Sequence, residues 1–249
     1  MLTADCHCPA RYNARMRSCA LLLLVPVLLF AQAAEVDITA EPHHHLVFAN
    51  DQVRVFSVEV APHSATLMHR HLHDYIYVTL GAADISNEVS GQPAAELKLA
   101  DGETRFSPGP FAHLVRDLAE QPFRNVTVEL LQDDKLRHST PHWTEDRGLE
   151  ILHGGTQEIL FVKDGVRASE FDLQPGGKAP MPTGAFLLVA VSDLSLKEGD
   201  RPRNAPHNAW DPCCGYRKSG YSYWFPAGAL HALTNSGEQP AKFVTLEFP

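Results

Sequence analysis

Short hydrophobic runs, many of them β-branched, recur along the chain between turns. Examples are Val53–Val60, Phe186–Val191 and Phe243–Phe248. Such residues favour strands, and 18 Pro with 16 Gly break the chain into short elements rather than long helices. A chain of 249 residues, of which 44% are hydrophobic, can bury a sizeable core. We therefore predict an all-β fold.

An internal repeat links the two halves of the chain. The segment Leu46–Arg54 reappears as Ile159–Arg167, an offset of 113 positions (54 to 167). The segment Gln121–Glu129 returns as Gln239–Glu247, an offset of 118 positions (121 to 239). Self-similarity of this kind indicates a duplicated unit.

Residues 1–33 have the features of a secretory signal peptide. Three arginines precede the apolar run Ala20–Phe30, and Ala31–Ala33 fits the small-x-small cleavage pattern. The run is too short for a comfortable membrane span, so we expect no stable membrane anchor. The start codon stays open between Met1 and Met16. The prediction is a secreted or periplasmic protein.

Removal of that segment leaves an acidic chain. It carries 18 basic residues (21 minus 3) and 29 acidic residues (30 minus 1), a formal charge of −11 (18 minus 29). An acidic surface disfavours nucleic acid and anionic membranes as partners. We expect a small-molecule partner, and a homodimer stays open. Cys213 and Cys214 are the cysteines that remain, and a vicinal bridge, an intermolecular bridge and free thiols are all open.

Three histidines alternate with other residues just before a β-type run. Successive side chains of a strand point to opposite faces, so His69, His71 and His73 would project the same way. Three imidazoles on one face indicate a metal site, whereas solvent-facing histidines on an edge strand are the alternative. A second element favours the metal: Gly102–His113 is a turn rich in Gly and Pro that ends in a histidine before another apolar stretch.

Together the two segments resemble the two motifs of the cupin superfamily. The first motif holds a His-x-His pair, an acid and a glycine, and the second holds a Gly/Pro turn followed by a histidine and an asparagine. The matching residues are His69, His71 and Gly81 in the first motif and Gly102, Pro108 and His113 in the second. The departures are His63 and Pro110 in place of glycines, Asp74 in place of glutamate, and Asp117 in place of asparagine.

The resemblance implies a set of metal ligands. They are His69, His71 and His113, with Asp74 as an acidic fourth ligand. Asp74 is one carbon shorter than glutamate and follows His71 closely, so His73 or water is the alternative fourth ligand. The implied cofactor is a divalent first-row transition metal (Fe, Mn, Ni or Zn), whose identity the ligand types do not fix.

The resemblance also implies two tandem antiparallel jelly-roll β-barrels, a fold that protects sheet edges and encloses a pocket. We place a metal-binding N-terminal barrel at residues 34–145 and a C-terminal barrel at residues 146–249. In the second copy His69 and His71 map onto Pro182 and Gly184, which cannot bind a metal through a side chain. His231 alone is then a structural histidine, because metal sites need several protein donors, and we predict a degenerate second site.

Other histidines and the function complete the sequence-based expectations. The cluster His43–His45 lies near the mature N-terminus, and we expect it to be an exposed polar group.

Two function classes fit. The first is a metalloenzyme, such as an oxygenase, isomerase or lyase acting on a small organic substrate. The second is a non-enzymatic protein that binds a sugar or an organic acid. We favour a secreted metal-binding bicupin of unassigned activity.

Overall fold

A computed structural model describes residues 34–138, 143, 147–198, 215–229 and 232–249. The proposed signal peptide, the cysteine pair and His231 lie outside these ranges and stay predictions. Within them, no helix combines the length and hydropathy that crossing a membrane would take.

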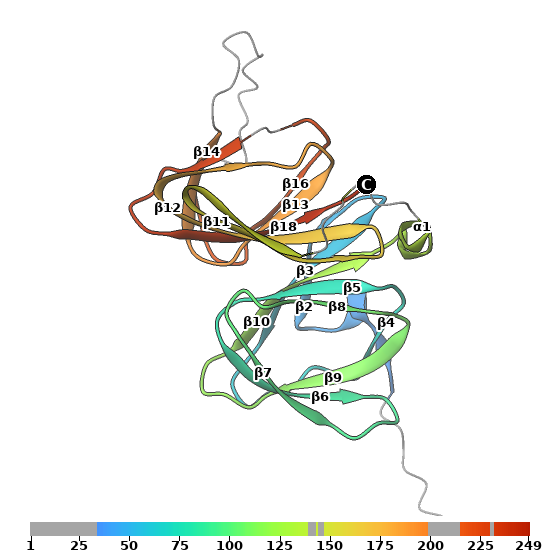
Figure 1. Ribbon diagram of the computed structural model, residues 1–249. Coiled ribbons are helices and arrows are strands. Elements are labelled where there is room, and N and C mark those ends of the chain that lie inside the picture. The colour runs from blue at the N-terminus through green and yellow to red at the C-terminus, as the bar shows by residue number, and fades with distance from the viewer. Residues whose placement is uncertain (1–33, 139–142, 144–146, 199–214, 230–231) are drawn as a thin grey trace, which may run out of the picture. The chain divides into compact units, whose positions relative to one another are not determined.

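The strands of the N-terminal half form two five-stranded sheets, ordered β1-β4-β9-β6-β7 and β2-β3-β10-β5-β8 (Figure 1). Their neighbours pair antiparallel, except that β1 and β4 are parallel. A 3-10 turn at Ile38–Ala40 and helix α1 at Asp133–Arg137 flank them. The strands are β1 (Val36–Asp37), β2 (His44–Ala49), β3 (Val53–Val60), β4 (His69–His71), β5 (Tyr75–Thr79), β6 (Ala83–Val89), β7 (Ala95–Leu99), β8 (Thr104–Ser107), β9 (Phe111–Asp117) and β10 (Phe123–Leu130).

The C-terminal half forms one eight-stranded sheet, coloured from yellow to red in Figure 1. Its order is β15-β14-β17-β12-β18-β13-β16, with β11 paired to β12. The strands are β11 (Gly148–Lys163), β12 (Val166–Pro180), β13 (Phe186–Ala190), β14 (Leu194–Glu198), β15 (Gly215–Arg217), β16 (Ser222–Phe225), β17 (Ala232–Asn235) and β18 (Ala241–Glu247).

The internal repeat is visible in the strand pairing. The order β2-β3-β10-β5-β8 corresponds to β11-β12-β18-β13-β16, element for element. A register shift between Leu46 and Phe48 in β2 recurs between Ile159 and Phe161 in β11, again 113 positions apart (46 to 159). The two halves therefore share a strand pattern down to the same bulge.

The turn after β9 shows the same correspondence in side chains. Asp117 is buried and accepts backbone N–H groups of Ala119 and Phe123, each at 3.0 Å. Asn235, 118 positions later (117 to 235), accepts the Gly237 N–H at 2.9 Å in the equivalent turn. Asp117 thus anchors a turn, as an asparagine would.

Strand alternation gives the sheet of β3, β10 and β5 two buried faces. Along β3, Val53 and Val55 join one hydrophobic cluster, and Phe56, Val58 and Val60 join another. The first cluster also takes side chains from the C-terminal half, namely Val166, Ala168, Leu187, Val189, Val191, Val244, Leu246 and Phe248. The second cluster lies between the two N-terminal sheets, in the same interior that holds the histidines.

The interior of the C-terminal strands is a third, apolar cluster. Two stacked pairs of rings fill much of it: Phe171 on Phe243, with ring centroids 4.9 Å apart, and Phe186 on Phe225, 4.6 Å apart. No metal-competent group of His, Cys, Asp or Glu occurs in this half among the residues that the structure describes.

Candidate metal centre

Two of the predicted ligands lie on β4 and point into the N-terminal barrel. His69 is fully buried and His71 is 1% exposed. His69 is the Cα partner of His113 on β9, so cross-strand pairing brings these side chains to one face. The strand ends at His71, and His73 turns away toward Asp133, with 3.5 Å between His73 Nδ1 and Asp133 Oδ1.

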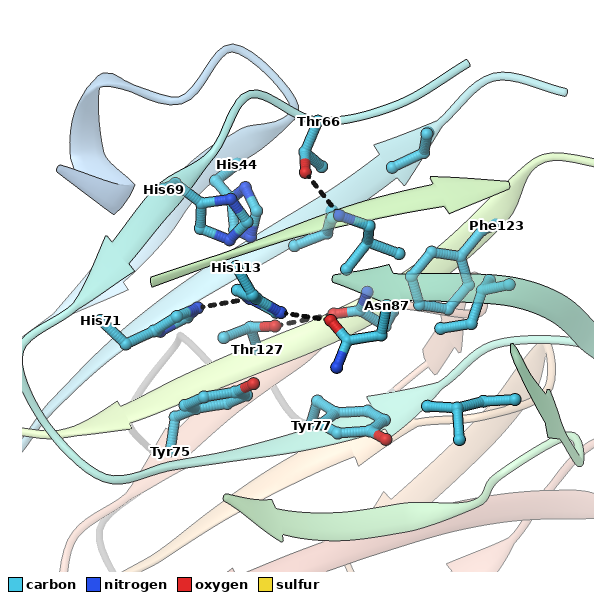
Figure 2. Close-up of a pocket in the computed structure, with 16 residues that line it drawn as sticks. His44, Thr66, His69, His71, Tyr75, Tyr77, Asn87, His113, Phe123 and Thr127 are labelled. Atoms are coloured by element: carbon cyan, nitrogen blue, oxygen red, sulfur yellow. Dashed lines mark hydrogen bonds between the residues drawn. The ribbon is translucent and has the colours of Figure 1, made fainter. Parts of the chain in front are cut away.

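His113 completes the predicted histidine trio. Its Nε2 lies 3.2 Å from Nε2 of His71, and its ring centroid lies 4.5 Å from that of His69. His113 comes from β9, the strand that follows the Gly/Pro turn. The structure therefore brings together the three histidines that the two motifs supplied (Figure 2).

His44 joins them as a fourth imidazole. One ring nitrogen from each of His44, His69 and His71 lies within 4.8 Å of the others. The His44 side chain is only 5% exposed, so the expectation of an exposed polar cluster at His43–His45 is wrong for this residue. The cause is the bulge in β2, which sets His44 opposite Val58, and Val58 faces the barrel interior.

Hydrogen bonds at Nδ1 fix the orientation of three rings. Nδ1 of His69 donates to the Leu67 carbonyl at 2.9 Å, Nδ1 of His113 to Asn87 Oδ1 at 2.7 Å, and Nδ1 of His44 to Glu41 Oε2 at 2.6 Å. Each partner is an acceptor, so Nδ1 carries the proton and Nε2 keeps a free lone pair. Outer partners of this kind orient metal-binding histidines.

The fourth ring faces a buried carboxylate. Nδ1 of His71 lies 3.4 Å from Oε1 of Glu129, which is longer than an ordinary hydrogen bond. Oε2 of Glu129 lies 2.7 Å from an Arg54 guanidinium nitrogen. Neither Glu129 nor the His71 ring is exposed by more than 1%, so this carboxylate holds His71 from behind.

Electrostatics keep the inner imidazoles neutral. Burial, reinforced by His44, lowers the pKa of His69 to about 3. Burial lowers the pKa of His71 as well, against the opposing pull of Glu129, and holds the pKa of His113 well below its usual range. Neutral imidazole is the form that binds a metal.

Asp74 lies apart from the histidines. It is fully buried, its Oδ1 accepts the Gly109 N–H at 2.8 Å, and its Oδ2 pairs with Arg137 at 2.5 Å. It does not line the cavity that the histidines share. A Cβ on Gly109 would lie 2.4 Å from the His73 carbonyl oxygen, so Asp74 holds together a loop that only glycine fits. Asp74 thus links the turn before β9 to helix α1 through Gly109 and Arg137.

The four imidazoles open on a cavity of about 60 Å³ inside the N-terminal barrel. Tyr75 stacks on His71, with ring centroids 4.0 Å apart, and Tyr77 lines the wall beside it (Figure 2). Burial raises the pKa of both tyrosines, so their hydroxyls stay protonated donors. Both tyrosines line the pocket.

The residues present fit a metal ion. Nε2 of His69 is buried without a hydrogen-bond partner, which costs roughly 1–3 kcal/mol unless something binds it. Two nitrogens that both bind one ion at about 2.1 Å lie roughly 3.0 to 3.4 Å apart, for bond angles near 90 to 110°. The 3.2 Å between the Nε2 atoms of His71 and His113 falls within that span.

Comparison with solved structures supports the jelly-roll fold described above. Neither a protein-family model nor a curated protein sequence matches the chain. AerE from Microcystis aeruginosa is similar in structure, with a TM-score of 0.51 at 12% identity over 84% of this chain and 98% of that chain. Lactobacillus farciminis oxalate decarboxylase, in a formate complex, gives a TM-score of 0.53 at 13% identity over 80% and 78%.

A third similar structure belongs to a protein with manganese centres. It concerns the Mn(II) centres of Bacillus subtilis oxalate decarboxylase, with a TM-score of 0.52 at 12% identity over 80% of this chain and 69% of that chain. The chain has a cupin-type jelly-roll fold. At such identities the likeness is one of fold, and what this protein binds has to be argued from its own residues.

Proposed function

We propose that this protein is a metal-binding cupin whose N-terminal barrel holds one divalent first-row transition metal through His44, His69, His71 and His113. One observation carries the proposal. Three of the rings donate Nδ1–H to a fixed acceptor, which leaves their Nε2 lone pairs available. The fourth, His71, turns its Nδ1 toward Glu129, and its Nε2, 3.2 Å from that of His113, can bind the same ion when Nδ1 carries the proton. Imidazole ligands suit Fe, Ni and Zn, whereas Mn prefers oxygen ligands, and ligand type alone does not fix which of the four metals binds.

We further propose that the metal serves an enzyme acting on a small organic substrate, as an oxygenase, isomerase or lyase. When bound, the ion would polarise a substrate oxygen or activate O2. The protein contributes the rest: Glu41, Glu129 and Asn87 hold the imidazoles, and the protonated hydroxyls of Tyr75 and Tyr77 can donate hydrogen bonds to a bound substrate. The manganese centres of a structurally similar decarboxylase support this reading.

A second candidate is a binding protein without turnover. Of the sixteen described residues that line the cavity, none is Asp, Glu, Lys or Arg. Beyond the ligands themselves, only tyrosines could then exchange protons with a substrate, which favours binding over acid–base chemistry. Secretion, proposed from residues 1–33, would suit either role.

Metal analysis of protein purified without a histidine tag tests the proposal. The chain should bind one ion after reconstitution with Mn²⁺, Fe²⁺, Ni²⁺ or Zn²⁺ under anaerobic conditions. No ion under any condition, or two ions of comparable affinity, would contradict it. Oxygen uptake and CO2 release, measured with a panel of small organic acids and the loaded protein, then separate the enzyme from the binding protein.

A further inference from the structure

The cavity beyond the histidines is bounded by apolar side chains. In Figure 2 the histidines lie toward one end and Phe123 toward the other. The apolar part of the wall consists of Val58, Val60, Ile85, Leu97, Val115 and Phe123. All six belong to the hydrophobic cluster inside the barrel or pack against it. A bound molecule therefore meets imidazoles at one end and hydrocarbon at the other.

The arginines near this wall are paired with carboxylates, and neither of them lines the cavity. Arg105 forms an ion pair with Glu103 at 2.5 Å and interacts with the Tyr77 hydroxyl, so it is already neutralised. Arg54 is engaged by Glu129 at 2.7 Å. No cation among the described lining residues would meet an anionic group placed away from the metal. A buried anion without a partner costs several kcal/mol.

The charge of the loaded centre leaves room for one negative charge. The four imidazole ligands are neutral, whereas a carboxylate ligand would have carried a charge of its own. Behind them stand two buried carboxylates, Glu41 at His44 and Glu129 at His71, the latter paired with Arg54. Asp37 also interacts with Arg54 and His71, but it is exposed and solvent screens its charge, so the inner charges are those of the ion, Arg54 and the two buried carboxylates. A divalent ion and Arg54 supply three positive charges and the two carboxylates supply two negative ones. One positive charge is unbalanced, so a monoanion brings the centre to neutrality.

Size limits the ligand as well. A free volume of about 60 Å³ holds roughly four to six water-sized groups. We propose that the metal of this cavity binds a small monoanion through an oxygen atom, with a short aliphatic group packed against Ile85, Leu97 and Val115. The inference rests on the proposed metal site and names the ligand class for it.

A carboxylate series tests the proposal on the Co²⁺-loaded, full-length mature protein. The visible spectrum of bound Co²⁺ reports ligand binding to the metal during titration with acetate, propionate, butyrate and oxalate. Affinity should rise about fourfold for each added methylene, the value that corresponds to burying one CH2 group. Butyrate and oxalate have the same number of non-hydrogen atoms, and butyrate should bind more tightly. Metal content measured after each titration shows whether oxalate has merely removed the ion.

Variants separate the wall from the metal. Leu97→Asn should remove the gain from acetate to butyrate and leave acetate affinity and metal content unchanged. Leu46→Asn is the matched control, because Leu46 is 53% exposed and lies outside the cavity, and it should behave as wild type. If Leu97→Asn does not fold, Ile85→Val should lower butyrate affinity a few-fold on its own.

The outcomes are distinct. Equal affinity across the three monoanions, or tighter binding of oxalate with the Co²⁺ retained, would overturn the ligand class while leaving the metal site standing. Failure of the protein to take up Co²⁺ would instead overturn the proposed function, because no spectrum would then form at all.

Discussion

The imidazoles of His44 and His69 lie with their ring centroids 4.6 Å apart, although they come from different sheets. Glu41 ties the two together: it accepts Nδ1–H of His44 and also the Leu67 N–H at 3.1 Å, and the carbonyl of Leu67 holds His69. One buried carboxylate thus sets the positions of two candidate ligands.

Replacing His44 tests whether it is a ligand. Loss of an outer partner of a ligand costs about 10- to 100-fold in metal affinity, so loss of a donor in His44→Ala should cost at least as much. His45→Ala is the matched control, because His45 is exposed on the same strand, and its affinity should stay at the wild-type value. Isothermal titration with Zn²⁺ or Mn²⁺ compares the two. Equal affinities for both variants would remove His44 from the site.

Metal should stabilise the folded protein by mass action. At a free metal concentration 100 times the Kd, the free energy of unfolding should rise by about 2.7 kcal/mol. For a domain of this size that corresponds to an increase in Tm of roughly 5 to 10 °C. Thermal unfolding with metal and with EDTA measures it. His71→Ala should show no difference between the two conditions, and a shift as large as that of wild type would argue against His71.

Glu41 should make the free energy of unfolding depend on pH in the acidic range. Although burial alone would raise it, hydrogen bonds from His44, His43 and the Leu67 amide lower the pKa of Glu41 from 4.5 to about 2. The carboxylate therefore contributes stability that is complete above pH 4.5 and is lost as the pH falls toward 2, in total roughly 3 kcal/mol. Denaturant unfolding of metal-free protein between pH 6 and pH 2 measures the slope. The Glu41→Gln variant should be less stable than wild type at pH 6, and its free energy of unfolding should change less with pH below pH 4.5.

Asp74→Asn should destabilise the protein without emptying the metal site. The amide oxygen can still accept the Gly109 N–H, but the charge that holds Arg137 is lost. A loss of about 1 to 3 kcal/mol in the free energy of unfolding is expected for such a buried group. Metal titration of the same variant should give the wild-type Kd. A Kd weakened 10-fold or more would restore Asp74 as a ligand or its close support.

Much of this architecture could be predicted from the sequence. Short β-branched runs and Gly/Pro turns predicted an all-β fold, and the resemblance to cupins implied the jelly-roll; both are confirmed. Alternation correctly predicted that His69 and His71 share a face, whereas for His73 it was wrong, because the strand ends at His71; His113 was implied by the resemblance to cupins. Alternation is a property of each strand alone, so it can be read locally.

The fourth imidazole depended on register, which is not local. Continuing the pairing of Ala49 with Arg54 without interruption would have set His45 opposite Val58. The bulge between Leu46 and Phe48 sets His44 there instead, and a shift by one residue moves a side chain to the other face. The role of Asp74 was hidden for a similar reason, because its partner Arg137 comes from a helix far along the chain.

The two buried faces of the sheet formed by β3, β10 and β5 make the half that carries the candidate metal centre dependent on its neighbour. Asn125 and Thr127 of β10 line the cavity, while Val126 and Val128, which alternate with them, pack in the cluster that includes side chains of the C-terminal half. A fragment ending after α1 would leave those valines in water and would be expected to aggregate. The C-terminal half, with its phenylalanine-filled interior, thus covers the outer face of that sheet, and Leu187 or Val244 supports the candidate centre although neither lines its cavity.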